Sequence, residues 1–325
     1  MIETLKTMDG NRSRGRAVLF MLLSSFCFAL MGASVKYAVA IPVVQKVFFR
    51  NFIILILMVF SLRAKVCKMK TASGVSSVDV FSPEAFFKPS ELYLGHKGNR
   101  KALLFRSLLG LTGVISYFYT IDNLGLADSS MLSRLSPFFV TIFAALFLGE
   151  KISRIQVPAL TIAFTGALFI IKPSFDLTII PSLTGLLSAI AAGGAYTIIR
   201  SLKGKENPDT VIFWFSTISC LGMALPTIIG WKSPSFGEWI ALLSVGLTSA
   251  GGQFFLTRAY LLAPAGAISI YNYTNILFSL VLGFFFFSEF PDFWALAGGF
   301  LIILVALALF LYMRNPASFS RSESL

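Results

Sequence analysis

The feature that most constrains this chain is a series of apolar runs of about twenty residues, separated by short polar segments. Because a helix rises 1.5 Å per residue, about 20 residues cross a bilayer core about 30 Å thick. The runs are Ala17–Ala40, Val43–Leu62, Ala102–Ile121, Ala127–Leu148, Ile155–Ile171, Pro181–Ile199, Thr210–Gly230, Phe236–Thr257, Ala265–Phe287 and Phe293–Met313. They lack the alternation of barrel strands, so the sequence predicts an all-α membrane protein with ten transmembrane helices.

The composition agrees with this fold class and excludes others. Hydrophobic residues make up 56% of the 325 residues and charged residues only 13%, about half the charged share of a soluble domain. The net charge of +12 would indicate nucleic acid in a soluble protein. Here the basic residues flank apolar runs, so we expect a lipid bilayer and no nucleic acid as partner. Three cysteines and one histidine, His96, show no metal-ligand spacing, so we expect neither metal nor cofactor.

Lysine and arginine predict the orientation. With the N-terminus in the cytoplasm, 20 of the 27 basic residues fall on the cytoplasmic side, two fall outside (Lys172 and Lys232), and five lie within spans. Short cytoplasmic segments of membrane proteins carry an excess of Lys and Arg. We therefore expect both termini in the cytoplasm and the chain in the plasma membrane, which in bacteria is the inner membrane.

The domain organisation follows from the same runs. We expect a cytoplasmic tail (residues 1–16), a first five-helix half (17–172), a second five-helix half (181–313) and a second cytoplasmic tail (314–325). The first half includes one long polar segment, Arg63–Lys101, which is rich in Ser, Lys and Gly. Such a segment offers little apolar surface for packing, so it is interpreted as a cytoplasmic loop, with a regulatory element as the alternative.

The two halves resemble each other weakly. Ser129–Glu150 aligns with Ile268–Glu289 at an offset of 139 residues, whereas the first spans of the halves align at an offset of 164. The extra 25 residues of the first half fall where the long polar loop lies. An odd number of spans per half turns the second half upside down. The sequence therefore predicts two inverted five-helix repeats, an architecture that places substrate sites near the midplane between the repeats.

Several short motifs carry a family resemblance. They are Phe48-Phe49-Arg50-Asn51-Phe52, Leu104-Phe105-Arg106-Ser107-Leu108-Leu109-Gly110, Leu124-Gly125-Leu126-Ala127-Asp128-Ser129, Ser136-Pro137, Leu148-Gly149-Glu150-Lys151, Ala263-Pro264-Ala265 and Ser288-Glu289. In this order the chain resembles the drug/metabolite transporter superfamily, specifically its ten-span EamA-type carriers. It departs from the pattern at Ile276, where the first half has Pro137. The resemblance implies a secondary transporter that moves a small organic metabolite by alternating access.

Arginines within spans are the first candidates for substrate contact, because a charge at the bilayer centre costs about 2.5–3.5 kcal/mol on insertion scales. Arg50 and Arg134 both lie roughly 10–12 Å below the outer edge. Two guanidinium groups at similar depth suit a carboxylate or phosphate, so we predict an anionic or zwitterionic substrate. For Arg50, a structural lock on Asp128 or on helix C-terminal carbonyls is an equal alternative.

Polar and aromatic residues complete the predicted site. Ser130 and Thr141 share the helix face of Arg134 and supply neutral donors. The repeat offsets place Trp214 opposite Arg50 and Tyr273 opposite Arg134, with five further candidates nearby: Tyr196, Tyr260, Tyr271, Asn272 and Asn275. Ordinary packing is the alternative for each aromatic residue. Three basic residues nearer the span ends are explained by snorkelling to water: Lys36, Lys46 and Arg106.

The absence of acidic residues narrows the mechanism. No Asp or Glu occurs in the middle of an expected span, which argues against proton-coupled cation export through a buried carboxylate. Facilitated movement or exchange is favoured instead. Two other functions stay open: a membrane scaffold acting through residues 63–101, and, less favoured, an intramembrane enzyme, although no Ser/His or paired-Asp arrangement is present. The sequence fits either a monomer or a homodimer.

Overall fold

The computed structural model describes residues 2–72, 93–149, 156–171, 179–202, 204–262 and 269–313, and within these ranges every regular element is a helix. The helices are α1 (Ile2–Tyr37), α2 (Val43–Ala72), η2 (Lys97–Asn99), α4 (Arg100–Asn123), α5 (Leu126–Ser133), α6 (Ser136–Leu148), α7 (Gln156–Ile171), α8 (Ile180–Ser201), α9 (Pro208–Ile229), α10 (Phe236–Leu262), η4 (Ser269–Tyr273), α12 (Thr274–Phe287) and α13 (Phe293–Met313). All-helical structure suits a bilayer, because each helix satisfies its own backbone polar groups.

The helices have the dimensions of membrane spans. In the described ranges, seven stretches are long and apolar enough to cross a bilayer, one of them the combined run Leu126–Leu148 of α5 and α6. Three shorter apolar helices are Val157–Ile171, Tyr271–Phe287 and Phe293–Ala308. Each of these segments overlaps a run that the sequence predicts. The chain is a multi-pass α-helical membrane protein.

Two helices extend beyond the predicted spans. Helix α1 already begins at Ile2, so it takes in the expected N-terminal tail. Helix α2 continues past Leu62 to Ala72, into the expected loop. Its added residues are mostly straight-chain types with good helix propensity, and basic residues are favourable at a helix C-terminus. The centre of the expected loop, residues 73–92, lies outside the described residues.

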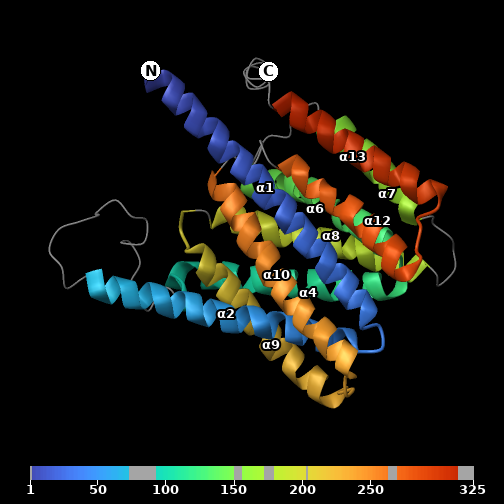
Figure 1. Ribbon diagram of the computed structural model, residues 1–325, viewed down its shortest axis with the longest axis horizontal. Helices are drawn as coiled ribbons and strands as arrows, with labels where there is room; N and C mark the ends of the chain where they lie inside the picture. Colours follow the sequence, from blue (N-terminus) through green and yellow to red (C-terminus); the bar gives the residue numbers. More distant parts are fainter. Residues whose placement is uncertain are drawn as a thin grey trace.

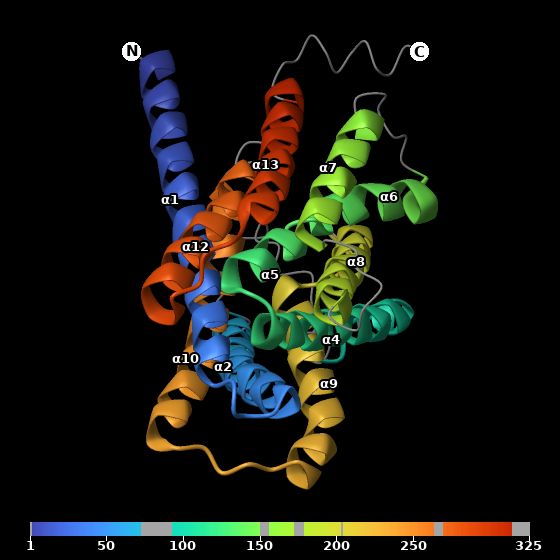
Figure 2. The same ribbon diagram turned by 90° about the vertical axis from the view of Figure 1, so that its right-hand side faces the viewer.

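The packing of the helices repeats itself. Helix α1 packs along α10, and α4 packs along α8 in the same way. The contact of α10 with α2 is matched by that of α4 with α9, and the contact of α1 with α12 is matched by that of α6 with α8. Helices α7 and α13 lie side by side at one edge of the molecule (Figure 1). The N-terminal end of α1 and the C-terminal end of α13 lie at the same end (Figure 2).

Glycine permits the close contact of α7 with α13. A Cβ atom on Gly166 would lie 2.7 Å from the carbonyl oxygen of Gly298, a separation that real Cβ atoms essentially never show. Small buried side chains, Ala163, Ala167 and Ala295, continue this interface. Apolar burial gives little drive between helices in lipid, so such small residues favour association by letting backbones touch.

The polar contacts between helix ends fall into two groups. At the end that the sequence predicts to be external, Lys36 pairs with Glu289 and Lys46 pairs with Asp122; these four residues are the outer ion-pair cluster. At the opposite end, Lys65 of α2 pairs with Asp209 of α9 at 3.0 Å. If successive helices alternate in direction across the membrane, the residues of the first group lie at one end of the helix bundle and Lys65 and Asp209 lie at the other, as the two groups of contacts do.

Candidate functional site

The run that carries Arg134 is interrupted in its middle. Helix α5 ends at Ser133, Arg134 and Leu135 form a turn, and α6 then starts with Pro137 in its first turn. Proline has no N–H to donate and its ring conflicts with the carbonyl four residues earlier, so it favours the first turn of a helix. The sequence therefore places Arg134 at a helix interruption.

The second half has an interruption at the corresponding place. Tyr273, which aligns with Arg134, is the last residue of the 3₁₀ helix η4 and directly precedes α12, with φ −70° and ψ −16°. Helices α6 and α12 also end alike, each followed by a left-handed residue: Gly149 with φ 69° and Ser288 with φ 53°. The backbone of the two segments therefore has the same course.

The structure brings the predicted residues Arg134, Ser130 and Tyr273 together. Arg134 interacts electrostatically with Tyr273 and with Tyr117 of α4. Ser130 donates a hydrogen bond of 2.7 Å to Ser279 of α12 and shares another with Tyr117. These five residues, from α4, α5, the α5–α6 turn and the start of the η4–α12 segment, are called the Arg134 cluster. Tyr117 and Ser279 were not predicted.

Two amides lie between α1 and the second interruption. Asn275 donates to the Ser25 carbonyl at 2.8 Å, while Ser25 donates to the Tyr271 carbonyl at 3.3 Å. The buried side-chain oxygens of Asn272 and Asn275 have no hydrogen-bond partner among the described residues. Because buried polar atoms are normally hydrogen-bonded, these two oxygens have unused acceptor capacity within the described residues.

Arg50 and Arg106 meet at one aromatic ring. Their guanidinium carbons lie 5.7 Å and 4.4 Å from the ring centroid of Phe215 on α9, and both arginines interact electrostatically with Tyr196 on α8. The snorkelling interpretation of Arg106 was wrong: its side chain is buried against Phe215, with an exposed fraction of 9%. The reason is that α9 packs against α4 and presents the face of Phe215 to the cation.

Other predicted residues have separate contacts. Trp214 does not supply the ring at Arg50; its indole N–H donates to the Tyr93 carbonyl at 3.1 Å. Thr141 donates to the Pro137 carbonyl within its own helix at 3.2 Å. Tyr271 packs on α1 beside Met21. Tyr260 belongs to α10, but its side chain lies outside the described residues.

The snorkelling interpretation was wrong for Lys46, and Lys36, whose side chain is 15% exposed, is held by protein partners. Lys46 is fully buried and donates to the Val35 carbonyl at 3.0 Å besides pairing with Asp122 at 2.6 Å. Lys36 donates to the Leu124 carbonyl at 2.6 Å, and Glu289 accepts from the Leu126 N–H at 2.9 Å. The outer ion-pair cluster thus fastens α1 to the α4–α5 and α12–α13 connections.

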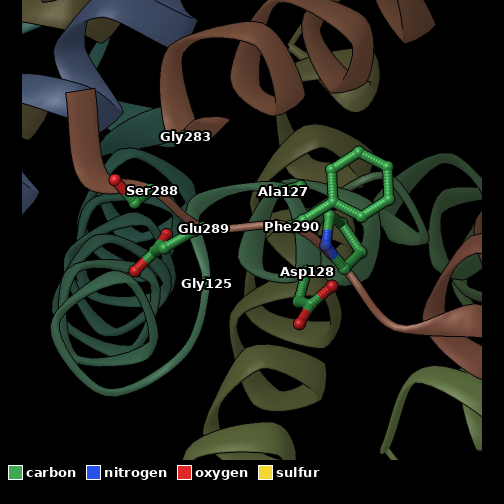
Figure 3. A pocket seen from close by; sticks show the side chains of 8 residues that line it. Gly125, Ala127, Asp128, Gly283, Ser288, Glu289 and Phe290 are labelled. Carbon is green, nitrogen blue, oxygen red and sulfur yellow. The ribbon is translucent and has the colours of Figure 1, made fainter. Parts of the chain in front are cut away.

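A pocket of about 350 Å³ adjoins this cluster. It is lined by Gly125, Ala127, Asp128, Gly283, Ser288, Glu289, Phe290 and Pro291. Ser288 and Glu289 lie on one side of the view, and Asp128 and Phe290 on the other (Figure 3). None of the predicted substrate-binding residues lines this pocket, so it belongs to the helix connections and not to the arginine sites.

Comparison with known proteins decides the family. The sequence profile of the EamA-like transporter family matches residues 15–172 and 179–311. This chain belongs to the EamA-like transporter family. A pseudopaline exporter, CntI, of Pseudomonas aeruginosa is 36% identical over 90% of this chain and 95% of its own length. A riboflavin transporter of Rhizobium johnstonii is 30% identical over 65% of this chain and 70% of its own length.

More distant relatives agree. Human solute carrier family 35 member G1 is 28% identical over 65% of this chain and 62% of its own length. A solved crystal structure matches 92% of this chain and 99% of that chain with a TM-score of 0.58 and 15% identity, which concerns the fold alone. The EamA family and these named relatives are transporters and not enzymes, so the chain is a membrane transporter with a small-molecule substrate.

Proposed function

We propose that this EamA-family transporter moves a small organic anion or zwitterion whose acidic group binds Arg134. The observation that carries the proposal is the position of Arg134 at a helix interruption, opposite the corresponding interruption at Tyr273. Tyr117 interacts with Arg134 and hydrogen-bonds Ser130, which in turn donates to Ser279, so three hydroxyl groups belong to the same cluster. A guanidinium with neutral donors beside it binds a carboxylate or phosphate through charge-assisted hydrogen bonds.

The same proposal includes a binding role for the η4–α12 segment, which carries Asn272 and Asn275. The unpartnered oxygens of Asn272 and Asn275 accept hydrogen bonds from an ammonium or hydroxyl of the substrate, which favours a zwitterion or hydroxylated acid. Arg50 of α2 and Tyr196 of α8 form a further part of the proposed site. The remaining candidates, Tyr271, Trp214, Thr141 and Tyr260, lie on η4, α9, α6 and α10, the helices that we propose enclose the site. The relatives are named for different solutes, so family membership alone does not name the substrate.

The architecture behind this function is two inverted five-helix repeats with ten spans. Three observations support it: the matched helix contacts, the matched ends of α6 and α12, and the family profile on two successive stretches. The basic residues favour cytoplasmic termini and, in a bacterium, the inner membrane. Residues 1–16 and 314–325 are then the cytoplasmic tails, and 17–172 and 181–313 the repeats.

Alternating access follows from this architecture. The Lys36–Glu289 pair links the first half to the second at the outer end, and Lys65–Asp209 links them at the inner end. A site between the halves opens to one side when the links at that side break. The expected spans carry no carboxylate in their middle, which argues against proton coupling through a buried acidic residue and favours facilitated movement or exchange of the substrate.

The experiment that tests the proposal is metabolite profiling of cells with the gene, without it, and with Arg134→Gln. Each metabolite that changes is then offered to the purified protein in proteoliposomes. We expect the transported compounds to carry a carboxylate or phosphate and their uptake to fall with Arg134→Gln. Transport restricted to cations or to uncharged solutes would contradict an anion-binding Arg134. A change in cells without any uptake in proteoliposomes would favour a scaffold role.

A further inference from the structure

A pair of arginines, Arg50 and Arg106, lies deep in the molecule and does not belong to the Arg134 cluster. Arg50 comes from α2 and Arg106 from α4, and the ring of Phe215 on α9 contacts both guanidinium groups. Gly110, one turn after Arg106, lets α4 approach this ring: a Cβ at Gly110 would lie 2.9 Å from Phe215. Three helices thus converge on two cations.

Three of the donor nitrogens of these two cations lack a hydrogen-bond partner among the described residues. The exposed fractions of Arg50 and Arg106 are 5% and 9%. One Arg50 nitrogen donates to Asn51 at 3.1 Å, but its Nε, and the Nε and Nη1 of Arg106, have no partner among the described residues. Among the residues that the structure describes, neither Arg50 nor Arg106 forms an ion pair with an acidic side chain. Native structures rarely leave so many buried donors unused.

Phe215 does not compensate for this burial. A guanidinium stays protonated in proteins, so neither arginine escapes the penalty by losing its charge. A cation–π contact offsets only part of the cost of desolvating an ion. The second arginine adds like-charge repulsion, since Arg50 and Arg106 interact electrostatically with each other. An oxyanion between them would satisfy the free donors, because the planar guanidinium fork matches carboxylate and phosphate.

We propose that Arg50 and Arg106, with Phe215 beneath them and Tyr196 near them, form a second subsite for an acidic group of the substrate. This inference rests on the proposed function. Arg106 lies on α4 eleven residues before Tyr117 of the Arg134 cluster, a helix distance of roughly 16 Å. The two subsites therefore select an elongated substrate that carries two acidic groups, with a carboxylate or phosphate at the Arg50–Arg106 end.

The test is the thermal stability of the full-length protein in detergent, measured without ligand and with defined probes. The probes are linear dicarboxylates from suberate to tetradecanedioate, whose extended lengths reach the inferred separation of the two subsites, each paired with the monocarboxylate of equal chain length, and inorganic phosphate. The variant is Arg106→Met, which replaces an uncompensated buried cation by an apolar side chain. The matched control is Lys101→Gln, which removes an exposed charge from the same helix.

We expect a dicarboxylate to stabilise the wild type at lower concentration than its monocarboxylate. Arg106→Met should keep or raise the melting temperature without ligand, yet bind the dicarboxylate roughly 10- to 150-fold more weakly; Lys101→Gln should bind normally. A phosphate response lost only in Arg106→Met assigns a phosphate group to the same subsite. The inference is overturned if Arg106→Met melts earlier without ligand, if dicarboxylates show no advantage, or if both variants behave alike. Arg134→Gln tests the proposed function separately: loss of anion uptake in Arg134→Gln together with unchanged dicarboxylate binding in Arg106→Met would overturn the second subsite and leave the proposed function standing.

Discussion

At the residue scale, the buried pair Lys46–Asp122 shows how strongly one missing partner should weaken the fold. Lys46 is fully buried and the side chain of Asp122 is 11% exposed. Removing one member of such a pair leaves an uncompensated charge, which typically destabilises by about 3–5 kcal/mol. We predict that Asp122→Asn lowers the melting temperature of the purified protein far more than Asp209→Asn. Lys65–Asp209 is the matched control, because its side chains are 28% and 21% exposed and more exposed pairs contribute less.

Replacing the lysine as well should restore part of the stability. In Lys46→Met with Asp122→Leu no unpaired charge is left in the interior, and apolar substitutes for buried ion pairs are often neutral or better. Equal melting temperatures for Asp122→Asn and Asp209→Asn would show that the buried pair contributes no more than an exposed one.

Arg134 carries the prediction about substrate affinity. Arg134→Gln removes the charge but keeps a polar side chain at the turn between α5 and α6. Losing one charge-assisted contact should weaken the apparent affinity for substrate by roughly 10- to 150-fold in proteoliposome uptake. Arg134→Lys should recover only part of this, since an ammonium cannot reproduce the bidentate fork. Normal uptake by Arg134→Gln, or its failure to fold, would assign a structural role to the arginine.

Residue partners were harder to predict than residue types. The sequence indicated Arg50, Arg134 and Tyr273 through spacing and repeat offsets, and the structure places aromatic groups beside both arginines. It did not indicate Phe215, because the offset pointed to Trp214, the neighbouring residue. A helix turns about 100° per residue, so an error of one position selects a different face. Arg106 was misjudged for a related reason: depth along a helix does not reveal which neighbour covers it.

At the element scale, the α7–α13 contact depends on the absence of side chains. Gly166→Ala would place a methyl group 2.7 Å from the Gly298 carbonyl oxygen, so the helices must separate. Overpacking of this kind typically costs about 1–3 kcal/mol. We predict a lower melting temperature for Gly166→Ala. Gly222→Ala on α9 should be neutral or stabilising, since the added Cβ would lie 3.4 Å from Cδ2 of Leu111 and alanine favours a helix interior. Similar melting temperatures for both variants would refute the close contact.

The helix interruptions were predictable in one half only. Pro137 accounts for the start of α6 by steric conflict and a missing donor. In the second half Ile276 stands at the aligned position, yet α12 still begins at Thr274. Asn272, Tyr273 and Thr274 have modest helix propensity, which permits an interruption but does not require one. The long extension of α2 was not predicted although its residues have good helix propensity, because the spans were read from hydropathy and the added residues are polar.

At the scale of the whole molecule, the number and positions of the apolar segments were the most predictable features. Hydropathy and length are set by the bilayer, so they can be read without knowledge of packing. The weak repeat was also informative, since aligned positions have matching backbone conformations at Gly149 and Ser288. The interhelical ion pairs were not predictable, because their partners lie far apart in the sequence: Lys36 pairs with Glu289.

The central claim is that two halves of opposite orientation enclose one substrate site, and aligned residues test it directly. Lys151 and Phe290 are related by the offset of 139 residues, so inverted repeats place them on opposite sides of the membrane. Single cysteines are introduced at these positions after replacing Cys27, Cys67 and Cys220. A membrane-impermeant maleimide should label Phe290→Cys in intact cells and Lys151→Cys only after permeabilisation. Labelling of both cysteines from the same side of intact cells would contradict the inverted architecture and the site built between its halves.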